Sequence, residues 1–306
     1  MHIQDIFKQR STTVSFEFFP PKDDGAAESL FNAIAELEAL RPSFVSVTYG
    51  AGGGTRQVTH DLVLRIKKET ALDPMPHLTC VCHTEAEIYD LLENYARAGV
   101  SNILALGGDT PRGMPDHDRS RDAFRYASDL VRFIRQFKDR HAGGLIPDPR
   151  GFGVGVAGFP EGHPATPNRL HEMDHLKAKV DEGADFIITQ LFFDNRDFYD
   201  FRERCEIAGI TVPIIAGVMP ITSIGGMKRM AELALCSRFP APLLRALDRC
   251  ADDAGARRVG VHWATQQCME LLDHNVRGIH LYTLNRSKAT REIYATLGVR
   301  DSLALM

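Results

Sequence analysis

The chain has 306 residues, of which 44% are hydrophobic, and a formal net charge of −4 from 36 basic and 40 acidic side chains. This length allows one large core or two ordinary ones, and the nearly balanced charge argues against a nucleic-acid-binding protein. No apolar run approaches the roughly 18 residues of a membrane span, and residues 1–5 lack the cationic and apolar blocks of a signal peptide. Six scattered cysteines without a CxxC pair fit a reduced cytoplasm.

Apolar segments alternate with segments of helical periodicity along the whole chain. The predicted strands are 14–19, 44–49, 77–82, 102–106, 152–159, 186–193, 213–219 and 278–284. The predicted helices are 26–40, 57–70, a stretch ending at 97, 123–138, 168–182, a stretch ending near 209, 227–235, 242–251, 256–272 and a last one after 285. Nearly continuous apolar strands are typical of a parallel sheet buried on both faces. We therefore predict an α/β protein with a single (β/α)8 TIM barrel over residues 1–306; an open doubly wound sheet is the alternative, because strand count alone does not prove closure.

Polar residues lie near the carboxyl ends of the predicted strands. They are Glu17, Thr48, Asp109, Glu161, His163, Gln190 and Arg286. Barrel enzymes build their active sites at the carboxyl ends of the strands, so these residues mark the expected site.

The first strand carries Glu17 between Phe16 and Phe18, and strand alternation places Ser15, Glu17 and Phe19 on one face. A carboxyl group buried among aromatic rings would have a raised pKa and could act as a general acid at neutral pH. The alternative is a glutamate at an edge that reaches water.

The segment Gly153–Gly158 matches the GxGxxG pattern of dinucleotide-binding folds. That fingerprint requires a glycine turn that opens a helix, whereas here the glycines lie inside a predicted strand and Phe159 and Pro160 follow. Close packing, or close approach of a ligand, is the better interpretation.

The segment His171–His175 matches HExxH, which on a helix brings two histidines to one face for zinc. A zinc hydrolase that uses His171, Glu172 and His175 is therefore an alternative function. The segment lies on the helix after the fifth strand, and no nearby motif supplies a third ligand. An exposed polar helix face is the other interpretation, and we predict no metal site.

Six segments together resemble the methylenetetrahydrofolate reductase family. They are FEFFPP at 16–21, VSVTYGA at 45–51, HLTC at 77–80, LALGGD at 104–109, ITQLFFD at 188–194 and YTLNR at 282–286. The resemblance covers nearly the whole chain in order, and the length matches the bacterial form, a catalytic barrel without a regulatory domain.

The resemblance implies an oxidoreductase that binds FAD non-covalently. NADH or NADPH would reduce the flavin and leave, and 5,10-methylenetetrahydrofolate would then bind and accept the hydride to give 5-methyltetrahydrofolate for methionine metabolism. We also expect a small-molecule folate substrate, no nucleic-acid or membrane partner, a homo-oligomer and a cytoplasmic location.

The resemblance also implies roles for individual positions. Glu17 would be the general acid, and Asp109 a catalytic carboxylate beside the flavin and the pterin. Asp109, Gln190 and Arg286 would contact folate. The cofactor contacts would be Thr48, Tyr49, Ala51, His77, Gly108, Asp109, Tyr126, Phe159, His163, Glu172, His175 and Lys179.

The chain departs from the family pattern at five positions. Gly107 stands where an arginine commonly precedes Gly-Asp, and Phe159 where a tyrosine commonly lies against the flavin. Glu172 and His175 stand where Asp and Asn contact the adenosine side, and Gly226 aligns with a folate-contacting glutamine. A flavin-free variant, with direct hydride transfer from a nicotinamide, therefore stays open.

The chemistry itself requires these residue types. The substrate's methylene group bridges N5 and N10, and a proton donor such as Glu17 would help to break the bond to N10. An ionised Asp109 would stabilise the resulting N5-iminium cation, although Gly-Asp-Thr-Pro is also good turn chemistry. The hydride chemistry belongs to the cofactor.

Overall fold

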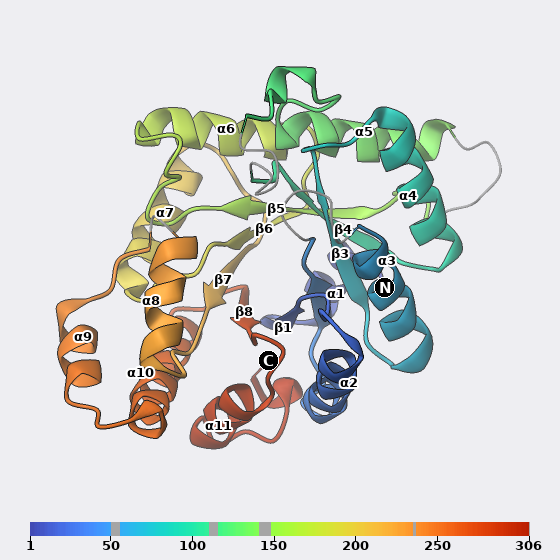
Figure 1. Cartoon of the computed structure of the whole chain (residues 1–306). Coiled ribbons are helices and arrows are strands. Elements are labelled where there is room, and N and C mark those ends of the chain that lie inside the picture. The colour runs from blue at the N-terminus through green and yellow to red at the C-terminus, as the bar shows by residue number, and fades with distance from the viewer. Residues whose placement is uncertain (50–55, 110–115, 141–147, 235–236, 306) are drawn as a thin grey trace.

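The computed structural model describes residues 1–49, 56–109, 116–140, 148–234 and 237–305, and its strands form a closed parallel barrel in chain order (Figure 1). The strands are β1 Thr13–Phe18, β2 Phe44–Val47, β3 Pro74–Thr79, β4 Asn102–Leu106, β5 Gly153–Gly158, β6 Phe186–Thr189, β7 Ile214–Val218 and β8 Gly278–Tyr282. Closure comes from β8, which pairs with β1 in parallel register. The predicted (β/α)8 barrel is thus confirmed, and the open sheet is excluded.

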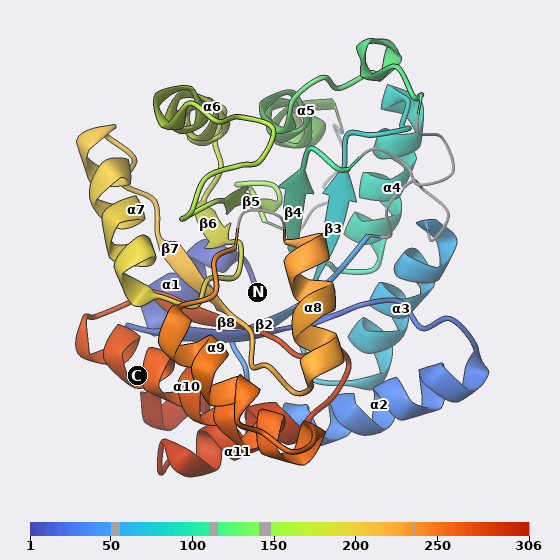
Figure 2. The same ribbon diagram turned by 60° about the vertical axis from the view of Figure 1, so that its left-hand side comes forward.

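Most of the helices surround the strands as an outer ring (Figure 2). They are α1 Ile3–Gln9, α2 Asp24–Glu38, α3 Arg56–Glu69, α4 Glu85–Arg97, α5 Ala127–Arg140, α6 Arg169–Asp181, α7 Asn195–Ile207, α8 Ile224–Leu233, α9 Ala241–Asp248, α10 Asp253–Asp273 and α11 Lys288–Thr296, with short 3₁₀ turns at Arg119–Arg121 and Ser302–Leu305. In the part of the chain with described coordinates, no helix is both long and apolar enough to cross a membrane.

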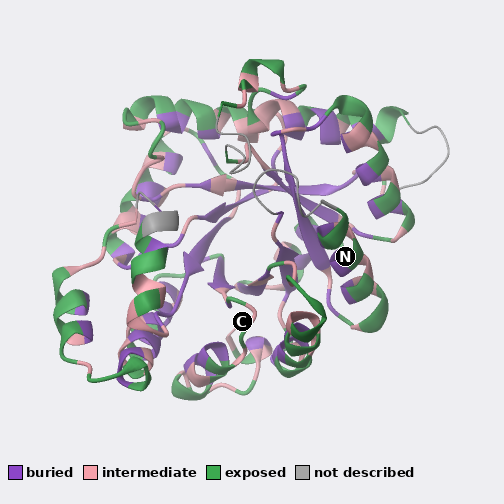
Figure 3. Cartoon of the chain, viewed as in Figure 1, coloured by how far each residue is buried: buried purple, intermediate pink, exposed green. Residues whose placement is uncertain are grey.

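Strand alternation divides the buried residues between two layers. Phe16 and Phe18 point outward into the core between strands and helices. There the Phe16 ring packs edge-to-face with Tyr294, with the ring centroids 6.3 Å apart. Phe44 and Phe186 belong to a smaller apolar layer with Ile3, which fills one end of the barrel interior. Figure 3 shows this division as buried strands inside helices whose outer faces are exposed. Apolar side chains therefore pack one end of the barrel interior, and the polar cluster around Glu17 lies toward the other end.

Helix α1 is the element that the sequence pattern missed. It has only seven residues, so its periodicity gives little signal. Ile3 and Ile6 are buried, and the Ile3 backbone N–H donates to Asn102 Oδ1 at 2.7 Å. The helix closes the end of the barrel that lies away from the carboxyl ends of the strands.

The third strand lies three residues earlier than predicted, because β3 begins at Pro74 and ends at Thr79. Just after β3, the Cys80 N–H donates to the Leu106 carbonyl of β4. The backbone N–H and C=O groups of the even-numbered residues in this segment therefore point toward β4. The β3–β4 register begins only at His77, beyond both Pro74 and Pro76, so the missing N–H groups of the two prolines interrupt no ladder there. Residues after Thr79 turn, and Cys82 adopts a φ of 58°.

The glycines of the GxGxxG segment lie inside β5, as predicted. A Cβ at Gly153 would lie 2.2 Å from Asn102 Oδ1, and one at Gly155 would lie 2.4 Å from the Phe186 ring. These glycines allow close packing in the barrel and open no dinucleotide-binding helix.

Candidate functional site

Polar side chains enter the barrel interior from four strands. Ser15 and Glu17 come from β1, Ser46 from β2, His77 from β3 and His280 from β8. The register pairs Ser15 with His280 and Glu17 with Ser46, so residues far apart in the sequence meet in one cluster.

Glu17 faces two imidazoles. Its Oε2 atom lies 3.6 Å from His77 Nε2 and 3.7 Å from His280 Nε2, and 19% of its side chain is exposed. The expected surroundings of aromatic rings differ from those found, because Phe16 and Phe18 point to the opposite face of the strand. The histidines enclose the carboxyl group instead.

The two histidines differ in their partners. Burial lowers the pKa of His77 to about 4, although Glu17 opposes that shift, and His77 Nε2 has no hydrogen-bond partner among the described atoms. His280 is held by Ser15 Oγ at 2.7 Å from Nδ1, and Ser46 Oγ lies 3.5 Å from Nε2. Sequence reasoning did not single out His280, yet alternation in β8 puts it on the inner face with Gly278 and Tyr282, and this was the available signal.

A second polar group lies over the carboxyl ends of β4 and β5. Asp109 is exposed after β4, and the charges of Asp109, Lys179 and His175 all act on His163. The pKa of His163 is lowered mainly by burial and then by the Lys179 charge, with Asp109 opposing. The Lys179 ammonium donates to the Ala157 carbonyl at 2.6 Å, and burial lowers the pKa of Lys179 to about 8. The structure therefore brings together several residues expected to contact the cofactor.

Aromatic rings flank this group. The rings of Phe159 and His163 pack edge-to-face with their centroids 4.6 Å apart, and the ring centroids of Tyr126 and His175 are 6.1 Å apart. Tyr126 is 51% exposed, and the Arg125 guanidinium lies over its ring, 5.3 Å from the ring centroid.

The HExxH residues do not converge on a metal position. His171 and His175 are exposed, whereas Glu172 is buried. The pKa of Glu172 is raised by desolvation, with the charges of Arg204, Arg169 and Lys179 opposing. Across the described ranges, no group of three or more His, Cys, Asp or Glu residues could hold a metal ion, so nothing here supports the zinc hydrolase.

Arg119 supports the turn after β4. Its guanidinium donates to the carbonyls of Gly107 and Gly108 at 2.8 and 2.9 Å. Gly108 has a φ of 80°, and a Cβ there would lie 3.0 Å from the Thr79 Cβ, so glycine is required. Sequence reasoning missed Arg119 because it lies in the loop that leads to α5, twelve residues beyond Gly107.

The other expected contacts are distributed around the strand ends. Thr48 follows β2 and is half-buried, and the neighbouring Tyr49 is buried with its hydroxyl 2.9 Å from His83 Nε2. Gln190 follows β6, and its Oε1 accepts from the Leu191 N–H at 2.9 Å. Arg286 is exposed after β8.

Two further positions complete this account. Gly226 lies in the first turn of α8, where its N–H donates to Ser223 Oγ. Ala51 lies outside the described residues.

A closed barrel with ionisable side chains gathered at the carboxyl ends of its strands defines the (β/α)8-barrel enzymes. The family model for methylenetetrahydrofolate reductase matches residues 2–298, and the chain belongs to that family of oxidoreductases. The resemblance inferred from the sequence is thereby confirmed.

Two curated relatives show how far the similarity extends. The 5,10-methylenetetrahydrofolate reductase of Escherichia coli K12 is 39% identical over 296 residues, which are 96% of this chain and 94% of that protein. The methylenetetrahydrofolate reductase (NADH) 1 of Arabidopsis thaliana is 37% identical to this chain over 98% of its residues. The matched region is 50% of the plant protein, so this chain spans about half the length of that relative.

A solved structure shares the fold. It is an uncharacterized protein from Clostridium thermocellum that binds two copies of 5-methyl-5,6,7,8-tetrahydrofolic acid, with a TM-score of 0.65 and coverage of 96% of this chain and 97% of that one. At 15% identity this likeness establishes the barrel alone.

Proposed function

We propose that the protein reduces 5,10-methylenetetrahydrofolate to 5-methyltetrahydrofolate with NADH or NADPH, in alternating hydride transfers through non-covalently bound FAD. The observation that carries the proposal is Glu17, a carboxyl group held between two histidines inside the barrel of a chain that matches the family model over residues 2–298. A binding protein without a reaction would have no need of such a group.

The residues over β4 and β5 fit a flavin nucleotide. Gly108 lets the backbone approach closely because a Cβ there would meet Thr79, and Tyr126 offers a partly exposed aromatic ring. Lys179 supplies a cation that uses one of its three donors on Ala157 and keeps two for an anionic group. Bound flavin would accept a hydride from the nicotinamide and pass it to the folate.

Glu17 is the group positioned to hold and move a proton. When the substrate's N10 loses its bond to the methylene carbon, the nitrogen must gain a proton, and a carboxylic acid can donate it directly or through one water. The Nε2 atoms of His77 and His280 both face one oxygen of the carboxyl group, Oε2. A neutral His77 leaves the carboxyl group able to take up and release a proton without a fixed ion pair.

Asp109 is positioned to stabilise positive charge. An exposed carboxylate at the end of β4 can accept hydrogen bonds from the donor edge of a pterin and can oppose the charge of an N5-iminium cation. The substrate then receives the hydride at the methylene carbon and leaves as the methyl product.

The test is to purify the full chain, record its absorbance spectrum and assay it with methylenetetrahydrofolate. We expect a flavin absorbance band at about 450 nm, which is a property of the cofactor. NADH or NADPH should bleach this band, and methylenetetrahydrofolate should restore it. Colourless protein that still reduces the folate with a nicotinamide would establish the flavin-free variant instead. Colourless protein that contains one zinc per chain and has no reductase activity would overturn the proposal.

Three further expectations accompany this function. We infer that the chain acts on a small-molecule folate in the cytoplasm, where its scattered cysteines would stay reduced. We also expect a homo-oligomer, and light scattering would then give a multiple of the 34.0 kDa chain mass.

A further inference from the structure

The turn that carries Asp109 is held both by close packing and by hydrogen bonds. Gly108 has a φ of 80°, and a Cβ there would lie 3.0 Å from the Thr79 Cβ, so the turn lies directly against the end of β3. Arg119 donates from Nη2 to the Gly107 carbonyl at 2.8 Å and from Nη1 to the Gly108 carbonyl at 2.9 Å. The Gly108 carbonyl belongs to the same planar peptide group as the Asp109 N–H. The guanidinium therefore fixes the peptide plane from which Asp109 continues.

Arg119 begins a short 3₁₀ turn in the loop that leads to α5. The Asp118 side chain caps this turn by accepting from the Ser120 N–H at 3.0 Å. Residues three apart lie on the same side of a 3₁₀ helix, so Arg119 and Asp122 are neighbours, with Nε and Oδ2 3.6 Å apart. The local sequence therefore directs the guanidinium toward a carboxylate.

Asp122 is the buried anchor of this arrangement, since only 3% of its side chain is exposed. Its Oδ1 accepts from the Cys82 N–H at 3.3 Å and lies 2.8 Å from His117 Nε2. Cys82 follows β3, so this one carboxylate joins the turn after β3 to the loop after β4. Its Oδ2 has no hydrogen-bond partner among the described atoms, and a buried carboxylate requires a cation nearby. Arg119 is therefore held where its two outer nitrogens reach the turn after β4.

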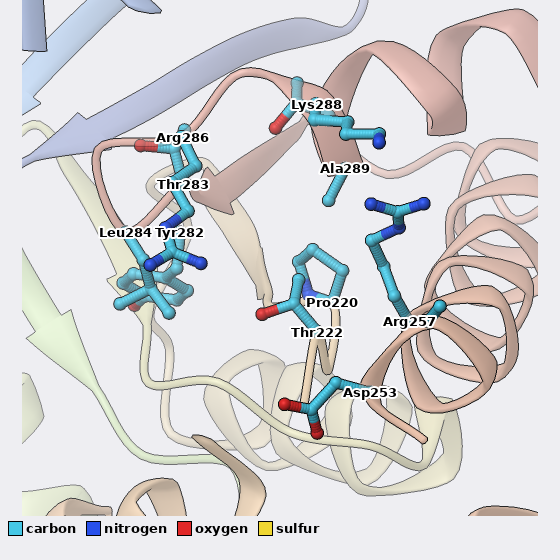
Figure 4. A pocket seen from close by; sticks show the side chains of 12 residues that line it. Pro220, Thr222, Asp253, Arg257, Tyr282, Thr283, Leu284, Arg286, Lys288 and Ala289 are labelled. Atoms are coloured by element: carbon cyan, nitrogen blue, oxygen red, sulfur yellow. The ribbon is translucent and has the colours of Figure 1, made fainter. Parts of the chain in front are cut away.

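Arg119 differs in this respect from the cations beside the last two strands. In Figure 4, Arg257, Arg286 and Lys288 line a cavity of about 260 Å³ next to the carboxyl ends of β7 and β8. Arg119 instead directs Nη1 and Nη2 at backbone carbonyls and Nε at Asp122. A guanidinium whose nitrogens all face the protein is suited to positioning another group.

We infer that Arg119 is a positioning residue for Asp109, and that Asp122 holds Arg119 in place for this task. The inference rests on the proposed function, because Asp109 is the carboxylate proposed to oppose the positive charge of the folate cation. A fixed turn keeps that carboxylate at one distance from the substrate, and a displacement of about 1 Å can slow a reaction about 10²-fold. Arg119 acts only through Asp109, and this makes the inference testable.

The experiment combines Arg119→Met with Asp109→Asn in the purified holoenzyme and follows each half-reaction by stopped-flow absorbance. Arg119→Met should slow reoxidation by methylenetetrahydrofolate about tenfold to 10²-fold and leave flavin reduction by NADH or NADPH near the wild-type rate. In the double variant, reoxidation should be no slower than in Asp109→Asn alone, because no carboxylate charge remains to be positioned. If the two effects multiply instead, Arg119 acts independently of Asp109 and the inference is wrong.

Three single variants test the geometry of this contact. Arg119→Lys keeps the charge but loses the planar fork, so reoxidation should stay at least about threefold slower than in the wild type, and a wild-type rate would overturn the inference. Asp122→Asn keeps an oxygen for the Cys82 N–H but removes the charge beside Arg119, and should slow the same half-reaction about threefold to tenfold. The matched control is Arg121→Met in the same 3₁₀ turn, where 86% of the side chain is exposed, and both rates should stay unchanged. Equal slowing by Arg121→Met and Arg119→Met would show a general effect of the loop and would overturn the inference.

A binding measurement separates failure of this inference from failure of the proposed function. Calorimetric titration of the purified protein with 5-methyltetrahydrofolate needs no turnover, and Arg119→Met should weaken binding about threefold to tenfold but add nothing to Asp109→Asn. If the protein reduces no folate yet shows this non-additive pattern, the proposed reaction fails and the positioning role stands. If folate is reduced and the two substitutions weaken binding independently, the positioning role is overturned.

Discussion

At the scale of single residues, strand alternation places chemically different groups on opposite faces of β1. Phe16 and Phe18 enter the outer core, whereas Ser15 and Glu17 face the barrel interior. The carboxyl group therefore meets imidazoles from neighbouring strands, and the proton-transfer role proposed for it is separate from the packing that holds the strand.

Glu17→Gln keeps the shape of the side chain and removes its titratable proton. We expect NADH or NADPH to bleach the flavin at a rate near that of the wild type, because direct hydride transfer opens no ring. Reoxidation by methylenetetrahydrofolate should be slower by about 10²–10⁴-fold, the range for a lost general acid. Stopped-flow absorbance measures both half-reactions, and equal slowing of the two would show that Glu17 is structural.

Asp109→Asn removes a charge at the end of β4. Folate binding should weaken and folate reduction should slow, by roughly the 10²–10³-fold seen when one electrostatic partner of a transition state is lost, while flavin reduction is retained. Rapid-mixing kinetics and folate titration check this. Wild-type folate turnover in the variant would mean that Asp109 serves only the turn.

His77→Gln should change how stability depends on pH. Since burial lowers the pKa of His77 to about 4, the unfolded chain binds a proton below about pH 6.5 that the folded chain refuses. The folded state therefore loses stability as the pH falls from about 6.5 to about 4, by on the order of 2 kcal/mol between pH 7 and 5. Urea unfolding of the apoprotein should show this loss reduced in the variant, whereas parallel pH profiles for both proteins would contradict it.

At the scale of elements, caps and close approaches decide where helices begin and how they pack. Helix α8 starts at Ile224 and α10 at Asp253, each three residues before its predicted start, because Ser223 and Asp252 accept from backbone N–H groups of the first turns. Farther along α10, Gly260 lies directly against the backbone of Ile221.

Gly260→Ala should therefore be strongly destabilising. Its Cβ would lie 1.9 Å from the Ile221 carbonyl oxygen and 2.8 Å from the Ile221 nitrogen, and backbone atoms yield less easily than side chains. We expect a loss of about 1–3 kcal/mol or more in the free energy of unfolding, measured with urea. The matched control is Gly225→Ala in α8, where a Cβ would meet nothing within 4 Å. This substitution should raise the free energy of unfolding by up to about 1 kcal/mol. Equal effects of the two changes would contradict this packing.

At the scale of the whole molecule, the two ends of the barrel differ. Helix α1 and the apolar layer around Phe186 close one end, and the polar groups around Glu17 occupy the other. The apolar closure of the barrel and the proposed chemistry therefore lie at opposite ends of the same barrel.

Ile3→Ala tests the closed end. Ile3 is 0% exposed, so the substitution should cost about 2–5 kcal/mol of unfolding free energy and leave the proposed flavin site intact. Ile207→Ala removes the same atoms from a residue that is 80% exposed and should change stability by less than about 0.5 kcal/mol. Calorimetry or urea unfolding distinguishes them, and similar values for the two variants would show that α1 does not seal the barrel.

The local sequence pattern determined much of the secondary structure of this protein and the faces on which its residues lie. The eight strands, the glycine-rich β5 and the inward face of Glu17 follow from neighbouring residues, because hydrophobic periodicity and steric limits act over a few positions. The position of Asp109 at a strand end follows in the same way.

Tertiary structure alone decided which of these residues meet. Glu17, His77 and His280 lie on three different strands, and Arg119 reaches Gly107 from a later loop, so their contacts depend on how strands align across the closed barrel. The resemblance implied only that Lys179 contacts the cofactor, whereas the packing of α6 on β5 also gives its ammonium group the Ala157 carbonyl as a hydrogen-bond acceptor. Such register and packing are set by the whole chain at once, and no short stretch of sequence contains them.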